Sequence, residues 1–158
     1  MALLISEDNE VKSSLEIVFL KNELQEKESI SWVPYKLILL SAKKSLTFET
    51  ESSNKGAGDY VLSLKPVNEI DNLISGIQSF LGNENKEMFS FEGLEPSFEL
   101  IFERSHKGYA VYFWIDAGNV ISDHYTWDGF GLRFFTSEKN IKSFVNELEK
   151  CKRELQVE

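Results

Sequence analysis

Hydrophobic and polar residues alternate along much of the chain with a period of two, the pattern typical of β-strands. β-branched and aromatic residues, which favour strands, are common in these stretches. The run 32–40 is apolar on both parities, which predicts a strand covered on both faces. We expect strands at 11–20, 32–40, 46–50, 60–65, 88–91, 97–105, 109–116 and 132–135.

In two stretches the apolar spacing changes to three or four residues, which predicts amphipathic helices over about 67–81 and 138–155. Thr136 or Ser137 is a suitable N-cap for the second helix. Gly82 and Asn83 predict that the first helix ends there in a left-handed C-cap. The apolar stripes are Val67, Ile70, Leu73, Ile74, Ile77 and Phe80 in the first helix, and Ile141, Phe144, Val145, Leu148, Cys151 and Leu155 in the second.

Strands grouped around two helices predict an α+β fold, a largely antiparallel β-sheet with both helices packed on one face. The length of 158 residues favours one domain over 1–158, with residues 1–9 frayed. A strand-plus-helix pattern occurs at 60–81 and again at 132–152. It is either an internal duplication or the ordinary appearance of any strand followed by an amphipathic helix.

Composition excludes several classes of protein. The 26 acidic and 17 basic residues give a net charge of -9, which disfavours direct binding to nucleic acid. No apolar run approaches the ~18 residues of a membrane-spanning helix, and Met1–Ile5 is too short for a signal peptide. The single cysteine forms no internal disulfide and fits a reducing compartment. We therefore expect a cytoplasmic protein that does not associate with membranes.

Candidate catalytic and metal-binding residues are few. Asp116, Asp123, His124 and Asp128 lie close together in the sequence, but turn formation explains these aspartates equally well and no metal-binding spacing is present. Cys151 falls in a helical apolar stripe, where a thiol acts as a small hydrophobic group. We expect no catalytic residue, no cofactor, no metal and no enzymatic activity.

The distribution of charge is more informative. Residues 87–128 contain eight acidic residues against Arg104 and Lys107, and they are also rich in aromatics. Large aromatics beside carboxylates resemble a protein-binding surface, where Tyr and Trp anchor the partner and charges steer it. The alternative is a sheet covered on both faces, with the acids at its rim. The predicted partner-binding residues are Glu92, Glu95, Glu99, Glu103, Tyr112, Trp114, Asp116, Asp123, Trp127 and Asp128.

Phe91–Phe102 reads F-E-G-L-E-P-S-F-E-L-I-F, a strand, a Leu94-Glu95-Pro96 corner and a second strand. It follows a strand-plus-helix unit and precedes a hairpin and a closing helix. This order resembles the bacterial immunity proteins that protect against the WapI contact-dependent toxin, over about residues 60–155.

The resemblance implies a non-catalytic protein that binds the toxin's nuclease domain stoichiometrically. An acidic inhibitor suits such a domain, because a nuclease needs a basic cleft for its substrate. We therefore expect an immunity or inhibitor protein, monomeric or a weak homo-oligomer, with a basic toxin domain as its partner. Two alternatives remain open: an adaptor for another basic protein, and a small-ligand-binding domain or unrecognised enzyme with a pocket at Tyr112, Trp114 and Asp116.

Overall fold

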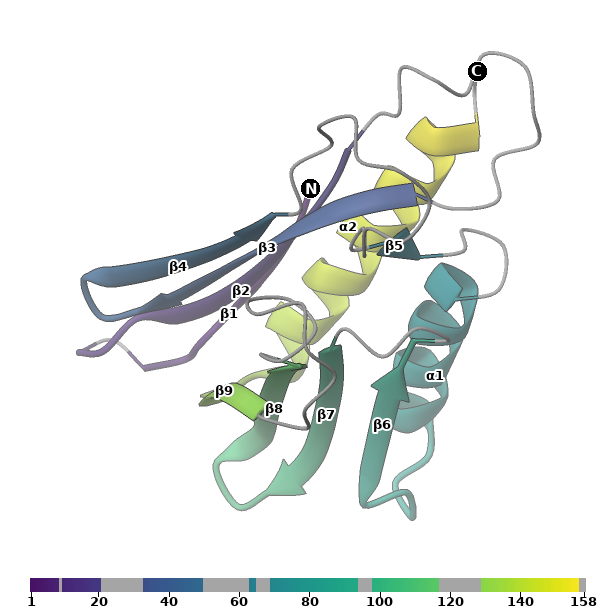
Figure 1. The fold of residues 1–158 in the computed structure, drawn as a ribbon. Helices are drawn as coiled ribbons and strands as arrows, with labels where there is room; N and C mark the ends of the chain where they lie inside the picture. The colour runs from purple at the N-terminus through teal and green to yellow at the C-terminus, as the bar shows by residue number, and fades with distance from the viewer. Residues whose placement is uncertain are drawn as a thin grey trace.

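The computed structural model describes residues 1–8, 10–20, 33–49, 63–64, 69–93, 98–116 and 129–156. These residues form two antiparallel β-sheets and two α-helices (Figure 1). The predicted α+β class with antiparallel strands is confirmed. The strands belong to two separate sheets, however, whereas the sequence predicted one.

The first sheet has the strand order β1-β2-β3-β4, and the short strand β5 pairs with the beginning of β3. Its buried face carries Leu4, Leu15, Leu37 and Leu39, each at most 4% exposed, because alternate residues of each strand point to the same side. The strands are β1 (Ala2–Ile5), β2 (Ser13–Phe19), β3 (Val33–Ser41), β4 (Lys44–Glu49) and β5 (Ser63–Leu64).

The second sheet has the order β6-β7-β8-β9, with every neighbouring pair antiparallel. Its strands are β6 (Met88–Glu92), β7 (Phe98–Ser105), β8 (Gly108–Asp116) and β9 (Gly129–Thr136). One parity of β7 and β8 is buried throughout, as the alternation predicts, and comprises Phe98, Leu100, Phe102, Tyr109, Val111, Phe113 and Ile115.

The two helices, α1 (Asp71–Gly82) and α2 (Glu138–Gln156), occur where the sequence predicts them. Ile70 already has helical backbone angles, and Val67 lies outside the described residues. The predicted stripes are buried from Ile70 to Phe80 in α1 and from Ile141 to Cys151 in α2. Ser137 caps α2, since its Oγ accepts a hydrogen bond from the Asn140 amide at 3.4 Å.

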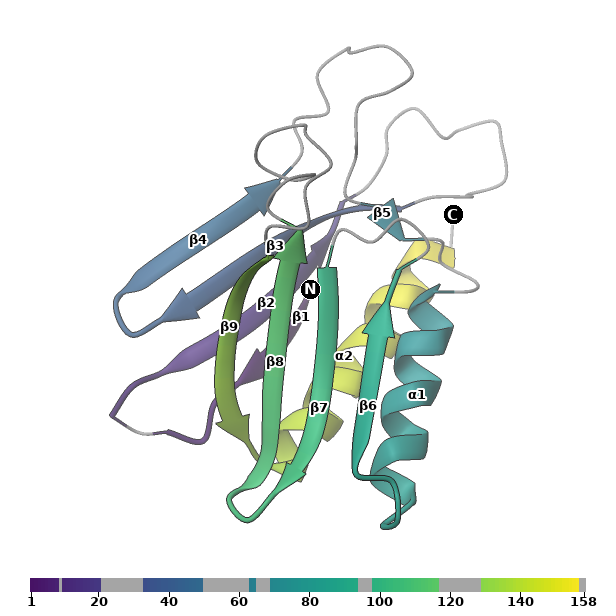
Figure 2. The same cartoon turned by 60° about the horizontal axis from the view of Figure 1, so that its bottom comes forward.

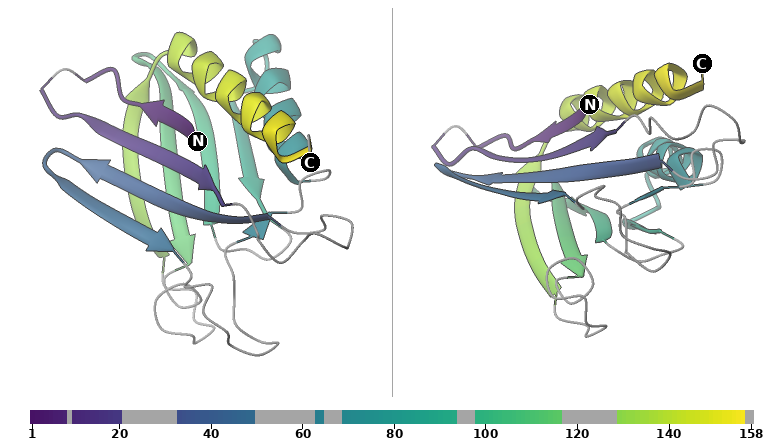
Figure 3. Two further views of the ribbon diagram at one scale, coloured as in Figure 1. Left: turned by 90° about the horizontal axis from the view of Figure 1, so that it is seen from above. Right: turned by 45° about the horizontal axis from the view of Figure 1, so that its top comes forward.

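The first sheet and both helices together cover one face of the second sheet. Figure 2 shows β6–β9 in front, with β1–β4 and α2 behind them and α1 beside β6. α2 runs alongside β1 (Figure 3), and the Leu3 amide of β1 donates to Glu147 Oε2 of α2 at 2.7 Å. One apolar core joins the two layers, and the edge-to-face contact of Tyr35 with Phe98 links β3 to β7. The other face of the second sheet is left without a covering layer of described residues.

Two further expectations are corrected by these contacts. Residues 1–9 were expected to fray, but Ala2–Ile5 form β1, with Ala2 and Leu4 completely buried. The strand is held from both sides, by β2 and by α2. The strand predicted at 32–40 was expected to be covered on both faces, yet Ile38 and Leu40 on the outward side of β3 are only half-buried.

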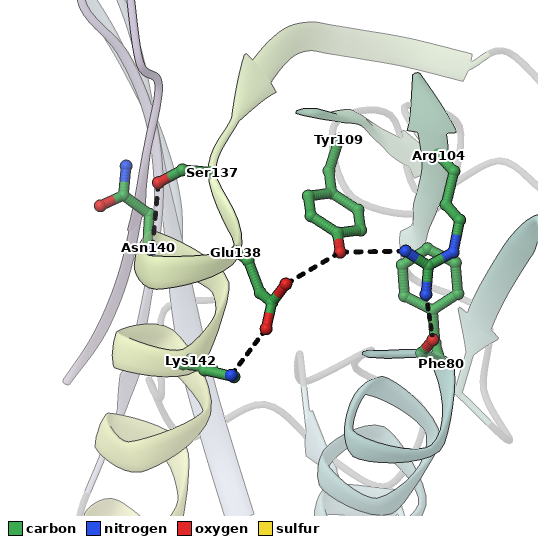
Figure 4. A network of polar contacts seen from close by, with 7 residues as sticks. All are labelled: Phe80, Arg104, Tyr109, Ser137, Glu138, Asn140 and Lys142. Carbon is green, nitrogen blue, oxygen red and sulfur yellow. Dashed lines mark hydrogen bonds and ion pairs between the residues drawn. The ribbon is translucent and has the colours of Figure 1, made fainter. Parts of the chain in front are cut away.

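The end of α1 also differs from the prediction. Asn83 is extended, with φ -119° and ψ 101°, and is not left-handed. The carbonyl groups at the end of α1 are satisfied from β7 instead. Arg104 donates to the carbonyl oxygen of Phe80 at 2.9 Å (Figure 4) and to that of Asn83 at 3.3 Å. Tyr109 accepts another Arg104 hydrogen bond and donates to Glu138, so the network reaches α2.

The strand-plus-helix units at 60–81 and 132–152 differ in their strands. β5 is a two-residue strand of the first sheet, whereas β9 is an eight-residue edge strand of the second. A common origin of the two units stays a prediction.

Candidate functional site

The uncovered side of the second sheet, which we call the outer face, is the candidate functional surface. It is formed by the residues that alternate with the buried ones, and strand pairing arranges them in rows across the sheet. One row holds Glu92, Glu99, Trp114 and Gly131; the next holds Ser90, Ile101, Tyr112 and Arg133; a third holds Met88, Glu103, Ala110 and Phe135.

Many of the predicted binding residues meet on this face. Glu92, Glu99 and Glu103 are exposed or half-exposed there, and Trp114 is 44% exposed. Tyr112 lies between them, half-buried. Asp116 belongs to the same parity but is only 9% exposed, so it is less accessible than the sequence suggested. The other predicted binding residues, Glu95, Asp123, Trp127 and Asp128, lie outside the described residues.

Hydrogen bonds between neighbouring strands orient two of these carboxylates. Ser90 Oγ donates to Glu99 Oε1 at 2.9 Å, and the Tyr112 hydroxyl donates to Glu103 Oε2 at 2.9 Å. The second bond raises the pKa of Tyr112, because the phenol must lose its hydrogen bond to ionise and would then face a carboxylate. Both carboxylates are therefore held in defined positions on the sheet.

Glycines on β9 determine how Trp114 lies. A Cβ atom on Gly131 would come within 2.3 Å of Trp114 Cε3, so the indole ring occupies the space that any other residue would fill. Gly129 is also close to the ring, because a Cβ atom on Gly129 would lie 3.6 Å from Trp114 Cε3. The ring rests against the backbone of β9 and yet remains 44% exposed.

A hollow of about 130 Å³ adjoins Trp114, where β6 and β8 end and β7 and β9 begin. Trp114 supplies the exposed apolar part of its lining, and Glu92 and Glu99 are paired directly opposite each other on β6 and β7. Its complete described lining is Glu92, Phe98, Glu99, Trp114, Ile115, Asp116 and Gly129.

The sequence prediction missed residues of β9 that also belong to the outer face. Arg133 lies over the rings of Tyr112 and Phe135, at 5.0 and 5.3 Å from their centres. The alternation of Phe130, Leu132 and Phe134 with Gly131, Arg133 and Phe135 was the signal that could have found them. The outer face is therefore acidic on β6 and β7 and carries a cation on β9.

A second hollow, of about 380 Å³, lies between α1 and α2. Its charged lining residues are engaged with each other, since Lys142 Nζ is 2.6 Å from Glu138 Oε1. This contact lowers the pKa of Glu138 and raises that of Lys142. Another lining residue, Gln78, donates to Glu149 at 2.9 Å. Most of this polar lining is thus already paired within the protein.

Within the described ranges, no group of three or more His, Cys, Asp and Glu residues is arranged to hold a metal ion. Neither α1 nor α2, the helices among the described residues, has the length and apolar character needed to cross a membrane.

Comparison of the chain with protein-family models, with curated proteins and with solved structures finds no match in any of the three.

Proposed function

We propose that this protein is a non-catalytic immunity or inhibitor protein that binds a basic bacterial toxin domain through its outer face. The observation that carries the proposal is the gathering of Glu92, Glu99, Glu103, Tyr112 and Trp114 on a sheet face that no described element covers. Charges of one sign concentrated on an accessible surface accelerate encounter with an oppositely charged protein.

The composition of the outer face also favours a macromolecular partner. Tyr, Trp and Met are enriched in protein interfaces, and Tyr112, Trp114 and Met88 all lie on this face. The face is built on strands, so its side chains are held by a rigid scaffold. The resemblance of residues 60–155 to the WapI immunity proteins gives the particular kind of partner, a toxin domain with nuclease activity.

A small-ligand-binding function is the second candidate, because the hollow beside Trp114 includes two of the residues predicted for such a pocket, Trp114 and Asp116. Its volume of about 130 Å³ argues against this function. Pockets for metabolite-sized ligands usually have ~300–1,000 Å³. The size suits a single side chain of a partner better than a free ligand.

The proposal is tested by co-expressing the protein with the toxin domain encoded by the neighbouring gene and measuring cell survival. The triple variant E92Q/E99Q/E103Q should lose protection and bind the purified toxin domain about 100-fold more weakly, mainly through slower association at low salt. Association of the unaltered protein should slow as salt is raised.

The matched control is E10Q/E84Q/E154Q, which removes as many negative charges from exposed positions on other elements. It should retain protection. If wild-type protein gave no protection, the immunity function would be excluded. Equal losses in both triple variants would exclude the outer face as the binding surface.

A further inference from the structure

The hollow beside Trp114 combines features that suit one kind of side chain. Facing carboxylates occur on many protein surfaces, and what distinguishes the pair Glu92 and Glu99 is the indole ring and the hollow beside it. We propose that this hollow, which we call the arginine pocket, accepts an arginine side chain of the protein that the outer face binds. The inference rests on the proposed function and specifies the recognition chemistry of its surface.

The two glutamates create a local need for a cation. Directly opposite residues on antiparallel strands have Cβ atoms ~5 Å apart, where like charges are unfavourable. Glu99 is bonded to the neutral hydroxyl of Ser90, and neither Glu92 nor Glu99 forms an ion pair within the part of the chain that the structure describes. A cation supplied by a partner would relieve this repulsion.

Trp114 makes a guanidinium the best-fitting cation. Arg stacks on aromatic faces and presents several N–H donors in a flat fork, whereas a Lys ammonium is a compact point charge. A flat group lying along the indole could donate to carboxylates on two neighbouring strands at once. The ring is held for this role by Gly131, whose missing side chain leaves the space that the indole occupies.

The apolar surface of the hollow suits the remainder of an arginine side chain. Trp114, 44% exposed, supplies this surface, whereas Phe98 and Ile115 border the hollow but are only 3% and 0% exposed. The methylene stem of Arg packs readily on such surface while its charged end stays near polar groups. The volume of about 130 Å³ is consistent with one side chain.

The experiment uses the full chain, labelled with ¹⁵N, and three blocked tripeptides, glycyl-arginyl-glycine and its lysine and citrulline counterparts. Citrulline has nearly the shape of arginine without the charge. We expect the arginine peptide to shift the indole Nε1–H signal of Trp114, assigned with W114F, and the backbone signals of Glu92 and Glu99. It should bind about tenfold more tightly than either counterpart.

Two variants test the parts of the pocket separately. E92Q/E99Q should weaken binding of the arginine peptide about tenfold, whereas E84Q/E87Q removes two charges from exposed positions just before β6 and should change it less than twofold. G131A should weaken binding without any change in charge, because its methyl group displaces the indole ring. If G131A does not fold, W114F tests the same part of the pocket. Its binding of the arginine peptide is measured from the Glu99 amide signal and should also be weaker.

Equal binding of the three peptides, shifts elsewhere on the protein, or equal effects of the two double variants would each overturn the arginine pocket. This failure is distinct from failure of the proposed function. A toxin domain that binds and is neutralised while the arginine peptide does not bind would contradict the pocket alone. A working arginine pocket without any protection against the toxin would contradict the immunity function alone.

Discussion

Ala42 occupies the tight turn between β3 and β4 with φ 55°, and no other non-glycine residue among those described has a positive φ. Its Cβ is strained there, because left-handed backbone brings the side chain of an L-residue too close to the next carbonyl oxygen. The amide of Ala42 is fixed by a 2.9 Å hydrogen bond to the carbonyl of Lys12, so the turn cannot easily relax.

A42G should therefore stabilise the protein by about 0.5–1 kcal/mol, since glycine adopts this conformation without steric cost. The free energy of unfolding in urea measures the effect. K43G, at the neighbouring turn position without a positive φ, should instead be destabilising because it only adds freedom to the unfolded chain. Stabilisation by K43G as large as that by A42G would contradict the strain at Ala42.

Glycines show how far single residues can be interpreted from sequence. Gly108 stands between the alternating stretches 97–105 and 109–116, where a turn must lie, and it has φ 105° with the Thr136 carbonyl oxygen only 2.8 Å from where a Cβ would stand. Gly131 carries no comparable local signal, because its role is to make room for Trp114 of the neighbouring strand. Turn chemistry is local and predictable, whereas space for a distant side chain depends on strand register.

At the scale of elements, α1 depends on β7 for its C-terminal end. α1 has no basic residue in its last turn. Arg104, which belongs to β7, supplies the cation at this end of the helix instead. The guanidinium also lies 5.0 Å from the ring centre of Phe80 and donates to the carbonyl of Lys86. A cation at this end opposes the partial negative charge of the helix dipole.

R104K should destabilise the protein by about 1–3 kcal/mol, because an ammonium cannot reproduce the fork that reaches Phe80, Asn83 and Lys86 together. Chemical denaturation measures the loss, and hydrogen exchange should show faster opening of the last turn of α1. R133K is the matched control, since the exposed Arg133 stacks on half-buried rings of the outer face, and it should cost less than about 1 kcal/mol. Similar costs for the two variants would contradict the capping role of Arg104.

At the scale of the whole molecule, β1 joins parts that are far apart in the sequence. It pairs with β2, lies against α2, and its Ile5 carbonyl accepts a 2.6 Å hydrogen bond from Thr136 at the end of β9. The Glu7 amide donates to the Phe135 carbonyl in the same region. β1 thus connects the first sheet, the second sheet and α2.

L4A should destabilise the protein by about 2–5 kcal/mol, because Leu4 is fully buried in this junction and its removal leaves a cavity. The adjacent I5A is the control: Ile5 is 43% exposed on the opposite side of the strand and should cost less than about 1 kcal/mol. Thermal and urea unfolding give both values. Comparable losses would mean that β1 is frayed in solution, as the sequence first suggested.

The sequence by itself determined the kind of element in each described helix and strand except β1, and which face of these elements is apolar. The alternation at 97–105 and 109–116 and the helical spacing from Ile70 to Phe80 are local patterns. Their periods follow directly from strand and helix geometry, so they can be recognised without knowing what the element packs against. The acidic and aromatic character of the second sheet could be predicted for the same reason.

Only the tertiary structure decided which elements pair and which face is left uncovered. The chain forms two sheets because β6–β9 pair among themselves, and the first sheet and the helices then share the burial of one side. Partner choice depends on contacts between residues far apart in the chain, which periodicity does not record. The same long-range register places Glu92 opposite Glu99 and lays Trp114 on Gly131, and so creates the arginine pocket that no local motif indicates.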